Sequence, residues 1–206
     1  MIEMAYALSE KFASLKPSAV REILKVTSQP GMIAFAGGSP DSAAFPCEEV
    51  KNITAEILDE NPVSALVYGV SEGYEPLRKT VAEWLKRRDN IGTEDDSVII
   101  TAGGTQVMDI TTRIMTSPGD TVICEEPSFI GSLNCFRSHG CKLAGVPIDA
   151  DGMNIDALER VIAENPDAKF IYTIPNFQNP GGTTMSLEPT RGSRKRKGWL
   201  PEWPNG

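Results

Sequence analysis

The chain has 206 residues, 40% of them hydrophobic, and its 28 acidic and 20 basic residues give a formal net charge of −8. This composition is that of a globular protein long enough to bury a core, while the negative charge argues against a general nucleic-acid binder. No run approaches the roughly 18 apolar residues of a membrane span, and charged residues interrupt the first 15 positions, where a signal peptide would have its apolar core, so we expect a cytoplasmic protein.

The first part of the chain is predicted to be mainly helical. Two predicted helices, residues 17–28 and 46–60, each have a proline in the first turn. A third predicted helix, residues 75–88, has its apolar residues on one stripe. Between the first two, residues 32–40 (MIAFAGGSP) predict a short strand and then a glycine-rich loop that brings the backbone close to another group.

From about residue 97 the pattern alternates between strands and helices. Short runs rich in β-branched residues predict four strands, at residues 97–101, 120–124, 142–147 and 169–174. The segments between them are long enough for crossover helices, which we expect at residues 105–115, 128–137 and 155–164. This alternation predicts an α/β protein built on a parallel sheet.

Neither a calcium site nor a zinc site is expected from residue spacing. Residues 149–152 (DADG) predict a turn, because the later acidic ligand of a calcium loop is absent. The four cysteines include no Cys-x-x-Cys pair and His139 is the only histidine, so the usual zinc spacing is missing. We therefore expect no metal site and reduced, structural thiols.

The last residues, 189–206, differ from the acidic body of the chain. They contain five of the 20 basic residues, two of the three tryptophans and three of the 15 prolines. The basic run at residues 191–197 is compatible with a nuclear-localisation or nucleic-acid patch. We favour an atypical, disordered end, because no periodic element or aromatic platform accompanies the charge.

Three loops are expected at the carboxyl ends of neighbouring strands, where open α/β sheets bind ligands. The first, residues 102–106 (AGGTQ), precedes a helix, so its backbone N–H groups and the helix dipole form a cradle for a phosphate. It matches neither the dinucleotide-binding nor the P-loop pattern. The others are residues 125–129 (EEPSF) and 175–182 (PNFQNPGG). Each segment alone is also compatible with a structural turn, and Phe129 with a place in the core.

Five stretches, in order and in spacing, resemble the class I/II aminotransferases, which are pyridoxal-phosphate (PLP) enzymes of fold type I. The likeness is greatest to the branch with 2-aminoadipate aminotransferases and the catalytic-like domain of MocR-type regulators. The stretches are IAFAGGSPD (33–41), YGVSEGYEPLRKTVAEWL (68–85), VIITAGGTQVMDI (98–110), EEPSF (125–129) and IPNFQNPGGTTMS (174–186). The resemblance implies an α/β, parallel-rich sheet flanked by helices, here truncated. Residues 1–45 would be the N-terminal arm and small-domain segment, residues 46–188 part of the large PLP-binding domain, and residues 189–206 an atypical tail.

The resemblance also implies how individual residues bind PLP. Gly103, Gly104 and Thr105 match the loop whose backbone amides hold the cofactor phosphate. Phe129 matches the aromatic residue that stacks on the pyridine ring, although tyrosine is commoner at that position. Asn179 matches the asparagine of the family's Asn-Pro-x-Gly motif, which donates a hydrogen bond to the phenolate oxygen.

Two further positions concern the neighbouring subunit and the substrate. Tyr68 matches a tyrosine that reaches the phosphate of the neighbouring subunit, so the resemblance implies a homodimer. Gly38 matches the glycine of a loop that lies close to the substrate, where the absence of a side chain leaves room.

The family also needs a lysine that forms a Schiff base with the cofactor, an aspartate for the pyridinium nitrogen and an arginine for the substrate carboxylate. All three lie beyond the matched region, and we expect a coding sequence cut short near Glu188. The parent protein would transfer an amino group from an amino acid to a 2-oxo acid. This chain would have no catalytic residue and no activity. The alternatives are the non-catalytic PLP-binding domain of a MocR-type regulator and a poorly folding truncated product.

Overall fold

A computed structural model describes residues 41–186, and these fall into two compact units, residues 41–100 and 101–186. The helix predicted at residues 17–28, the strand and loop at residues 32–40 with Gly38, and the tail at residues 189–206 lie outside the described residues. Within the described part of the chain, every helix is too short or too polar to traverse a lipid bilayer.

The first unit is helical. Its elements are the 3-10 helix η1 (Ser42–Ala44) and the helices α3 (Cys47–Glu60), α4 (Pro62–Leu66) and α5 (Glu75–Asp89). The predictions at residues 46–60 and 75–88 are confirmed as α3 and α5. The short helix α4 was not predicted; the side chain of Asn61 caps it by accepting a hydrogen bond from the Ser64 amide at 3.3 Å.

The strand predicted at residues 97–101 is wrong. These residues have no regular secondary structure. The Ile100 amide donates to the Glu72 carbonyl at 3.0 Å, and the Val98 carbonyl accepts from Nε of Arg78 at 2.6 Å. Because these backbone groups bond to a loop and to a side chain of α5, they form no ladder with a neighbouring strand, which a β-strand requires.

The second unit is an α/β structure with a mixed, mostly parallel sheet. Its elements in chain order are α6 (Gly104–Met115), β1 (Thr121–Glu126), α7 (Ile130–Ser138), β2 (Lys142–Asp149), β3 (Gly152–Met153), α8 (Ile155–Glu164) and β4 (Phe170–Tyr172). The sheet order is β3-β2-β1-β4, with β1 parallel to both β2 and β4 and with β3 antiparallel to β2. The three other predicted strands and the three predicted helices of this part are confirmed.

The hairpin between β2 and β3 confirms the predicted turn at residues 149–152. The side chain of Asp149 accepts a hydrogen bond from the Asp151 amide at 2.9 Å, and Gly152 has a φ of 104°, which a glycine adopts readily. The strand β3 itself was not predicted, since two residues are too few to show a period.

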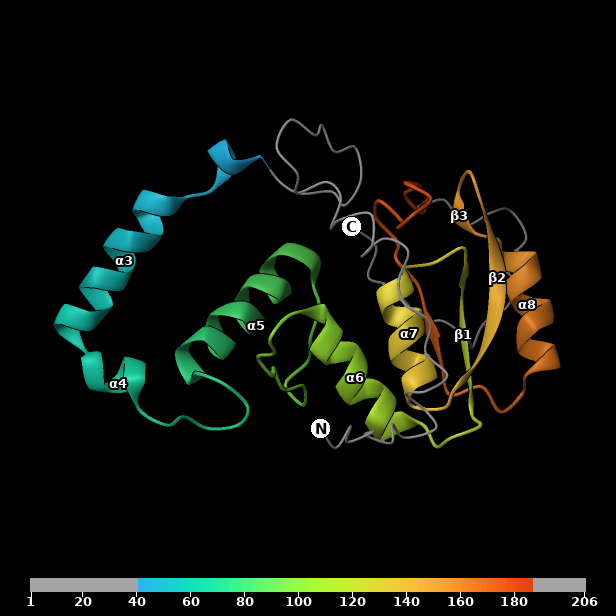
Figure 1. Cartoon of the computed structure of the whole chain (residues 1–206), viewed down its shortest axis with the longest axis horizontal. Coiled ribbons are helices and arrows are strands. Elements are labelled where there is room, and N and C mark those ends of the chain that lie inside the picture. The colour runs from blue at the N-terminus through green and yellow to red at the C-terminus, as the bar shows by residue number, and fades with distance from the viewer. Residues whose placement is uncertain (1–40, 187–206) are drawn as a thin grey trace, which may run out of the picture. The chain divides into compact units, whose positions relative to one another are not determined.

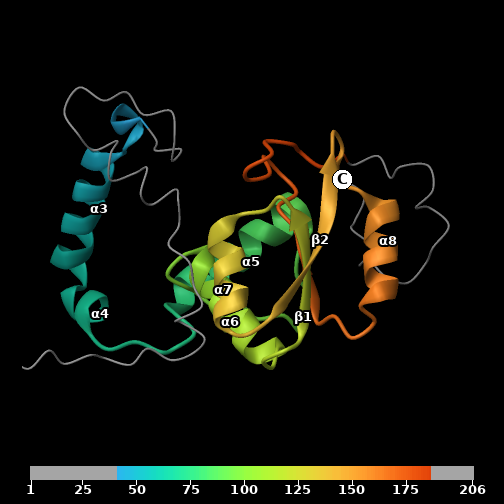
Figure 2. The ribbon, with the colours of Figure 1, turned by 45° about the vertical axis from the view of Figure 1, so that its right-hand side comes forward.

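Helices cover both faces of this sheet (Figures 1 and 2). The neighbouring residues Val122 and Ile123 of β1 point to opposite faces, as strand geometry requires, and each belongs to its own core cluster. On one face Ile123 packs with Leu158 of α8. On the other, Val122 packs with Phe136 of α7, and Met108 of α6 lies against this cluster.

Phe136 is the aromatic centre of the second cluster. Its side chain is buried, and its ring lies edge-on to Phe170 at 5.6 Å and to Tyr172 at 5.4 Å between centroids. These contacts connect α7 to β4 across the face of the sheet. The ring is therefore a main source of the stability of the second unit.

We predict that Phe136→Ala lowers the free energy of unfolding by about 3 to 5 kcal/mol, because it leaves a cavity lined by two aromatic rings. Urea titration followed by circular dichroism measures this loss. The control is Phe45→Ala, at a ring that is 52% exposed, for which we expect a much smaller change. Equal losses in the two variants would contradict this packing.

Candidate functional site

The first loop of the candidate site lies at the start of α6. Gly103 is the N-cap residue, with φ 84°, and no side chain caps the helix there. A Cβ atom on Gly103 would meet nothing within 4 Å, so the approach to the backbone is open. The amides of Gly104 and Thr105 begin the helix, where backbone donors have no intrahelical acceptor and the helix dipole is positive. This is the chemistry of an anion site.

The loop before these amides has a defined conformation because Gln106 folds back on it. Its side-chain oxygen accepts a hydrogen bond from the Ala102 amide at 2.5 Å, and its own amide donates to the Gly103 carbonyl at 3.1 Å. Residues 102 to 106 are all exposed. A phosphate group can therefore reach the first amides of α6 without a change in the fold.

The direction of α6 places its first turn at the carboxyl end of the sheet. The helix has 12 residues and so is about 18 Å long, and β1 has 6 residues and is about 20 Å long. At its far end, the Thr116 hydroxyl accepts a hydrogen bond from the thiol of Cys141, the residue before β2, at 3.3 Å. Since α6 ends where the strands begin, it starts where they end, as Figure 1 shows for α6 and α7.

The second loop follows β1 and carries Phe129. This residue is the N-cap of α7 and is half-buried. Its ring lies over the first turn of the helix, because a Cβ atom on Gly131 would come within 2.6 Å of two ring atoms. The Ser128 hydroxyl beside it is buried and has no hydrogen-bond partner among the described residues, so it is available to a polar group at this place.

The third loop follows β4 and contains Asn179, whose side chain is exposed, next to the buried Gln178. Two hydrogen bonds join the start of this loop to its end. The backbone amide of Gln178 donates to the Thr183 carbonyl at 2.7 Å, and the backbone amide of Phe177 donates to the Thr184 hydroxyl at 3.1 Å. The backbone on both sides of Asn179 is thereby held in one conformation.

A buried carboxylate links the second loop to the third. Glu125, at 2% exposure, accepts hydrogen bonds at one oxygen from the Thr173 hydroxyl at 2.6 Å and the Ile174 amide at 3.1 Å. Its other oxygen accepts from Nε2 of Gln178 at 2.9 Å. The same Nε2 atom donates to the Pro127 carbonyl at 2.9 Å. These bonds fix the loop of Asn179 against the loop of Phe129.

Sequence reasoning did not assign a role to Glu125 or Gln178. The sequence does contain a signal for Glu125, because this residue directly follows the apolar run VIC of β1. A carboxylate in a strand whose two faces are both covered must find hydrogen-bond donors. The partner could not be found in this way, because Gln178 lies 53 positions further along the chain.

The predicted site residues are thus brought together in part. The loops of Phe129 and Asn179 are hydrogen-bonded to each other through Glu125, and the loop of Gly103 lies toward the same end of the sheet. Tyr68 belongs to the first unit, where its side chain is 99% exposed. Gly38 lies outside the described residues.

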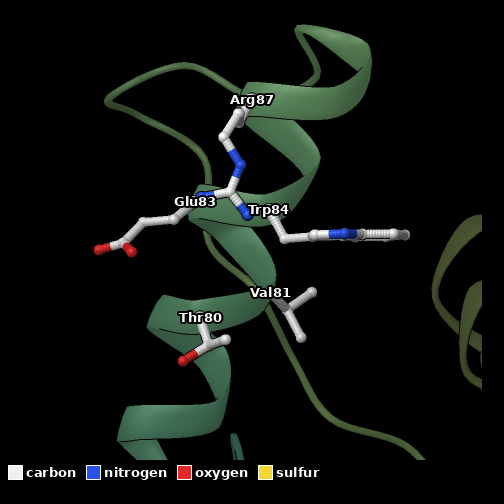
Figure 3. A pocket seen from close by; sticks show the side chains of 5 residues that line it. All are labelled: Thr80, Val81, Glu83, Trp84 and Arg87. Carbon is white, nitrogen blue, oxygen red and sulfur yellow. The ribbon is translucent and has the colours of Figure 1, made fainter.

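A hollow along α5 of the first unit contains none of the predicted site residues. It has a volume of about 200 Å³ and is lined by Thr80, Val81, Glu83, Trp84 and Arg87, all from that one helix (Figure 3). No residue predicted to bind a ligand lines it. A hollow formed along a single exposed helix gives a ligand only one wall, so we assign it no role.

Most of the chain resembles known proteins. Residues 30–191 match the family model for aminotransferase class I and II. The aromatic-amino-acid aminotransferase 1 of Thermococcus litoralis is 37% identical over 86% of this chain and 44% of its own length. The 2-aminoadipate transaminase of Thermus thermophilus is 41% identical over 84% of this chain and 42% of its own length.

A solved structure of an aminotransferase is also similar to this chain in fold and in sequence. The crystal structure of LysN, an α-aminoadipate aminotransferase from Thermus thermophilus complexed with N-(5'-phosphopyridoxyl)-L-leucine, has a TM-score of 0.76. It is 37% identical over 87% of this chain and 43% of its own. Transcriptional regulators are also related; YdcR of Escherichia coli is 28% identical over 80% of this chain and 35% of its own length. The chain spans less than half the length of these proteins.

We predict that Glu125→Gln destabilises the chain by about 2 to 3 kcal/mol, because the new amide NH₂ group would face donors that need an acceptor. The control is Glu126→Gln, at the exposed neighbouring position, for which we expect a change within about 0.5 kcal/mol. Urea unfolding measures both. If Glu125→Gln were as stable as the control, the carboxylate link would not hold the two loops.

Proposed function

Because the chain belongs to the aminotransferase class I and II family, we propose that the protein transfers an amino group from an amino acid to a 2-oxo acid, with PLP as its cofactor. The observation that carries the proposal is the meeting of the Phe129 and Asn179 loops at the end of the sheet where α6 begins. The relatives and the pyridoxyl compound in the LysN structure support the choice of cofactor.

The chemistry of the described residues fits PLP. Its phosphate suits the amides of Gly104 and Thr105, since a helix start favours an anion, and the open backbone at Gly103 gives access to them. Its flat ring suits the half-buried ring of Phe129, and its phenolate oxygen suits the exposed amide of Asn179 as a donor. The unpaired hydroxyl of Ser128 adds a polar group beside the ring position.

Each of these residues would have a separate task. PLP supplies, when bound, an electron sink for the bonds at the substrate α-carbon. The Gly104 and Thr105 amides would anchor the phosphate, Phe129 would hold the ring in one plane, and Asn179 would donate a hydrogen bond to the phenolate oxygen. Glu125 would act as a positioning residue, since its contacts hold the loops that carry Phe129 and Asn179.

We also propose that the reactive lysine comes from a part of the protein outside this chain. The second unit has two lysines among its described residues, Lys142 and Lys169. Both stand at the amino-terminal side of strands, at the opposite end from the candidate site. Lys169 also lies 3.9 Å from the Asp120 carboxylate. Neither described lysine of the second unit would therefore react with the cofactor there, and we propose that the chain by itself binds PLP without catalysing transamination.

The remaining features of the intact protein are proposals of the same kind. The protein would be a cytoplasmic homodimer in which Tyr68, fully exposed in the single chain, reaches the phosphate of the neighbouring subunit. Residues 1–45 would belong to the N-terminal arm and small domain, with Gly38 near the substrate. Residues 46–188 would belong to the PLP-binding domain, followed by a tail at residues 189–206.

A second candidate is the PLP-binding domain of a transcriptional regulator, which the similarity to YdcR supports. The identity to YdcR is 28%, against 41% to 2-aminoadipate transaminase, over similar shares of this chain. This difference favours the enzyme. Turnover of an amino acid and a 2-oxo acid by the intact protein, measured beside its binding to DNA, separates the two candidates.

We predict that Gly104→Asp weakens PLP binding at least about tenfold, since a carboxylate at the helix start would repel the phosphate. The fold should be kept, because acidic residues are favourable at helix N-termini, and because a Cβ atom there meets only the Met108 methyl group at 3.9 Å. The control is Gly104→Ala, which adds the Cβ atom without charge. Equilibrium dialysis measures both affinities, and equal binding by the two variants would refute the phosphate position.

A further prediction tests whether the reactive lysine lies outside this chain. When the chain with bound PLP is treated with borohydride, we expect that no lysine becomes labelled with one equivalent of cofactor. The bound cofactor should instead leave on dialysis. Peptide mass spectrometry locates any labelled residue. Stoichiometric labelling of one lysine of this chain would contradict the proposal.

A further inference from the structure

A group of three potential metal ligands lies where α6 packs against α7, away from the starts of these helices. Asp109 of α6, Cys135 of α7 and His139 just after α7 have ligand atoms that all lie within 4.8 Å of one another. Nε2 of His139 is 2.7 Å from Oδ1 of Asp109. Cys135 and His139 are four residues apart, which places them on the same side of the helix.

We propose that Asp109, Cys135 and His139 form a zinc site with three protein ligands and one open position. A thiolate, an imidazole and a carboxylate are the three ligand types that zinc takes from proteins. Magnesium and calcium prefer oxygen ligands alone, so a site with sulfur and nitrogen selects against them. This proposal is independent of the function proposed above.

The geometry requires only small movements. Bonds of about 2.0 to 2.3 Å in a tetrahedral zinc centre place the ligand atoms roughly 3.3 to 3.7 Å apart. The distance between the Asp109 and His139 ligand atoms must therefore increase slightly from 2.7 Å. The distances from the Cys135 sulfur to these two atoms, which are at most 4.8 Å, must shorten where they exceed this range. The side chains of His139 and Asp109 are 17% and 35% exposed, so both can turn and an ion can enter from solvent.

Neighbouring residues already orient the ligands. Nη2 of Arg113 donates to Oδ2 of Asp109 at 2.6 Å, which leaves Oδ1 for the metal and holds the carboxylate from outside, as second-shell partners do. The His139 amide donates to the Phe136 carbonyl at 3.1 Å, and the buried Phe136 ring anchors this end of α7. Bound zinc would therefore join α6 to α7, the helices whose first turns carry the Gly103 and Phe129 loops.

The test uses the fact that the chain has a single histidine. Its two carbon-bound imidazole protons are thus the only imidazole C–H signals in the NMR spectrum of the untagged chain. We expect both signals to shift on addition of zinc sulfate, to saturate at one equivalent, and to be unchanged by excess magnesium. Signals that do not move at one equivalent of zinc would overturn the proposal.

Variants identify the other ligands. Cys135→Ser and Asp109→Asn should each weaken zinc binding at least about tenfold, as measured by isothermal titration calorimetry. The matched control is Cys47→Ser, at an exposed thiol of the first unit, which should bind zinc as the unchanged chain does. Full affinity in Cys135→Ser, or loss of binding in Cys47→Ser, would assign the zinc to other groups and would overturn the site.

A third test uses the unchanged chain, so it remains valid if the variants fold poorly. Cobalt bound in place of zinc should produce the ultraviolet charge-transfer band of a cobalt–thiolate bond and the visible bands of four-coordinate cobalt. Zinc should then displace it. A cobalt spectrum without the thiolate band would show that Cys135 is not a ligand and would also overturn the proposal.

Discussion

The buried carboxylate of Glu125 is the constraint on which the candidate site depends. A carboxylate inside a protein must be hydrogen-bonded or its burial is very costly, and Glu125 finds its donors only because the loop after β4 folds back over the end of β1. Gln178 then bonds to Glu125 and to the Pro127 carbonyl at once. The need of the Glu125 carboxylate for hydrogen-bond donors thereby brings together the Phe129 and Asn179 loops, which are about 50 positions apart in the sequence.

The sheet supplies the frame for this arrangement. Its parallel strands end on the same side, and α6 and α7 start there because each helix ends close to the start of a strand (Figure 1). The two core clusters on opposite faces hold the helices in these positions. Loops that are separate in sequence therefore collect at one end, which is where open α/β sheets bind ligands.

Much of this fold can be predicted from the sequence, because the spacing of apolar residues shows which face of a helix or strand is buried. Residues 155–164 were predicted as a crossover helix with the bounds that α8 has. The structure adds its cap, since the Asn154 side chain accepts a hydrogen bond from the Ala157 amide at 2.9 Å. Residues 97–101 were predicted as a strand from composition, which does not tell whether a neighbouring strand is present. The contacts of Glu125 and the group around His139 were beyond prediction, because they join residues that only the folded chain brings together. The roles of Phe129 and Asn179 came from family resemblance.

The most direct test of the account is a crystal structure of the chain grown with PLP. We predict that the cofactor phosphate accepts hydrogen bonds from the Gly104 and Thr105 amides, that its ring contacts Phe129, and that the Asn179 side chain lies beside its phenolate oxygen. A phosphate bound elsewhere, or Phe129 and Asn179 on different sides of the sheet, would contradict the account.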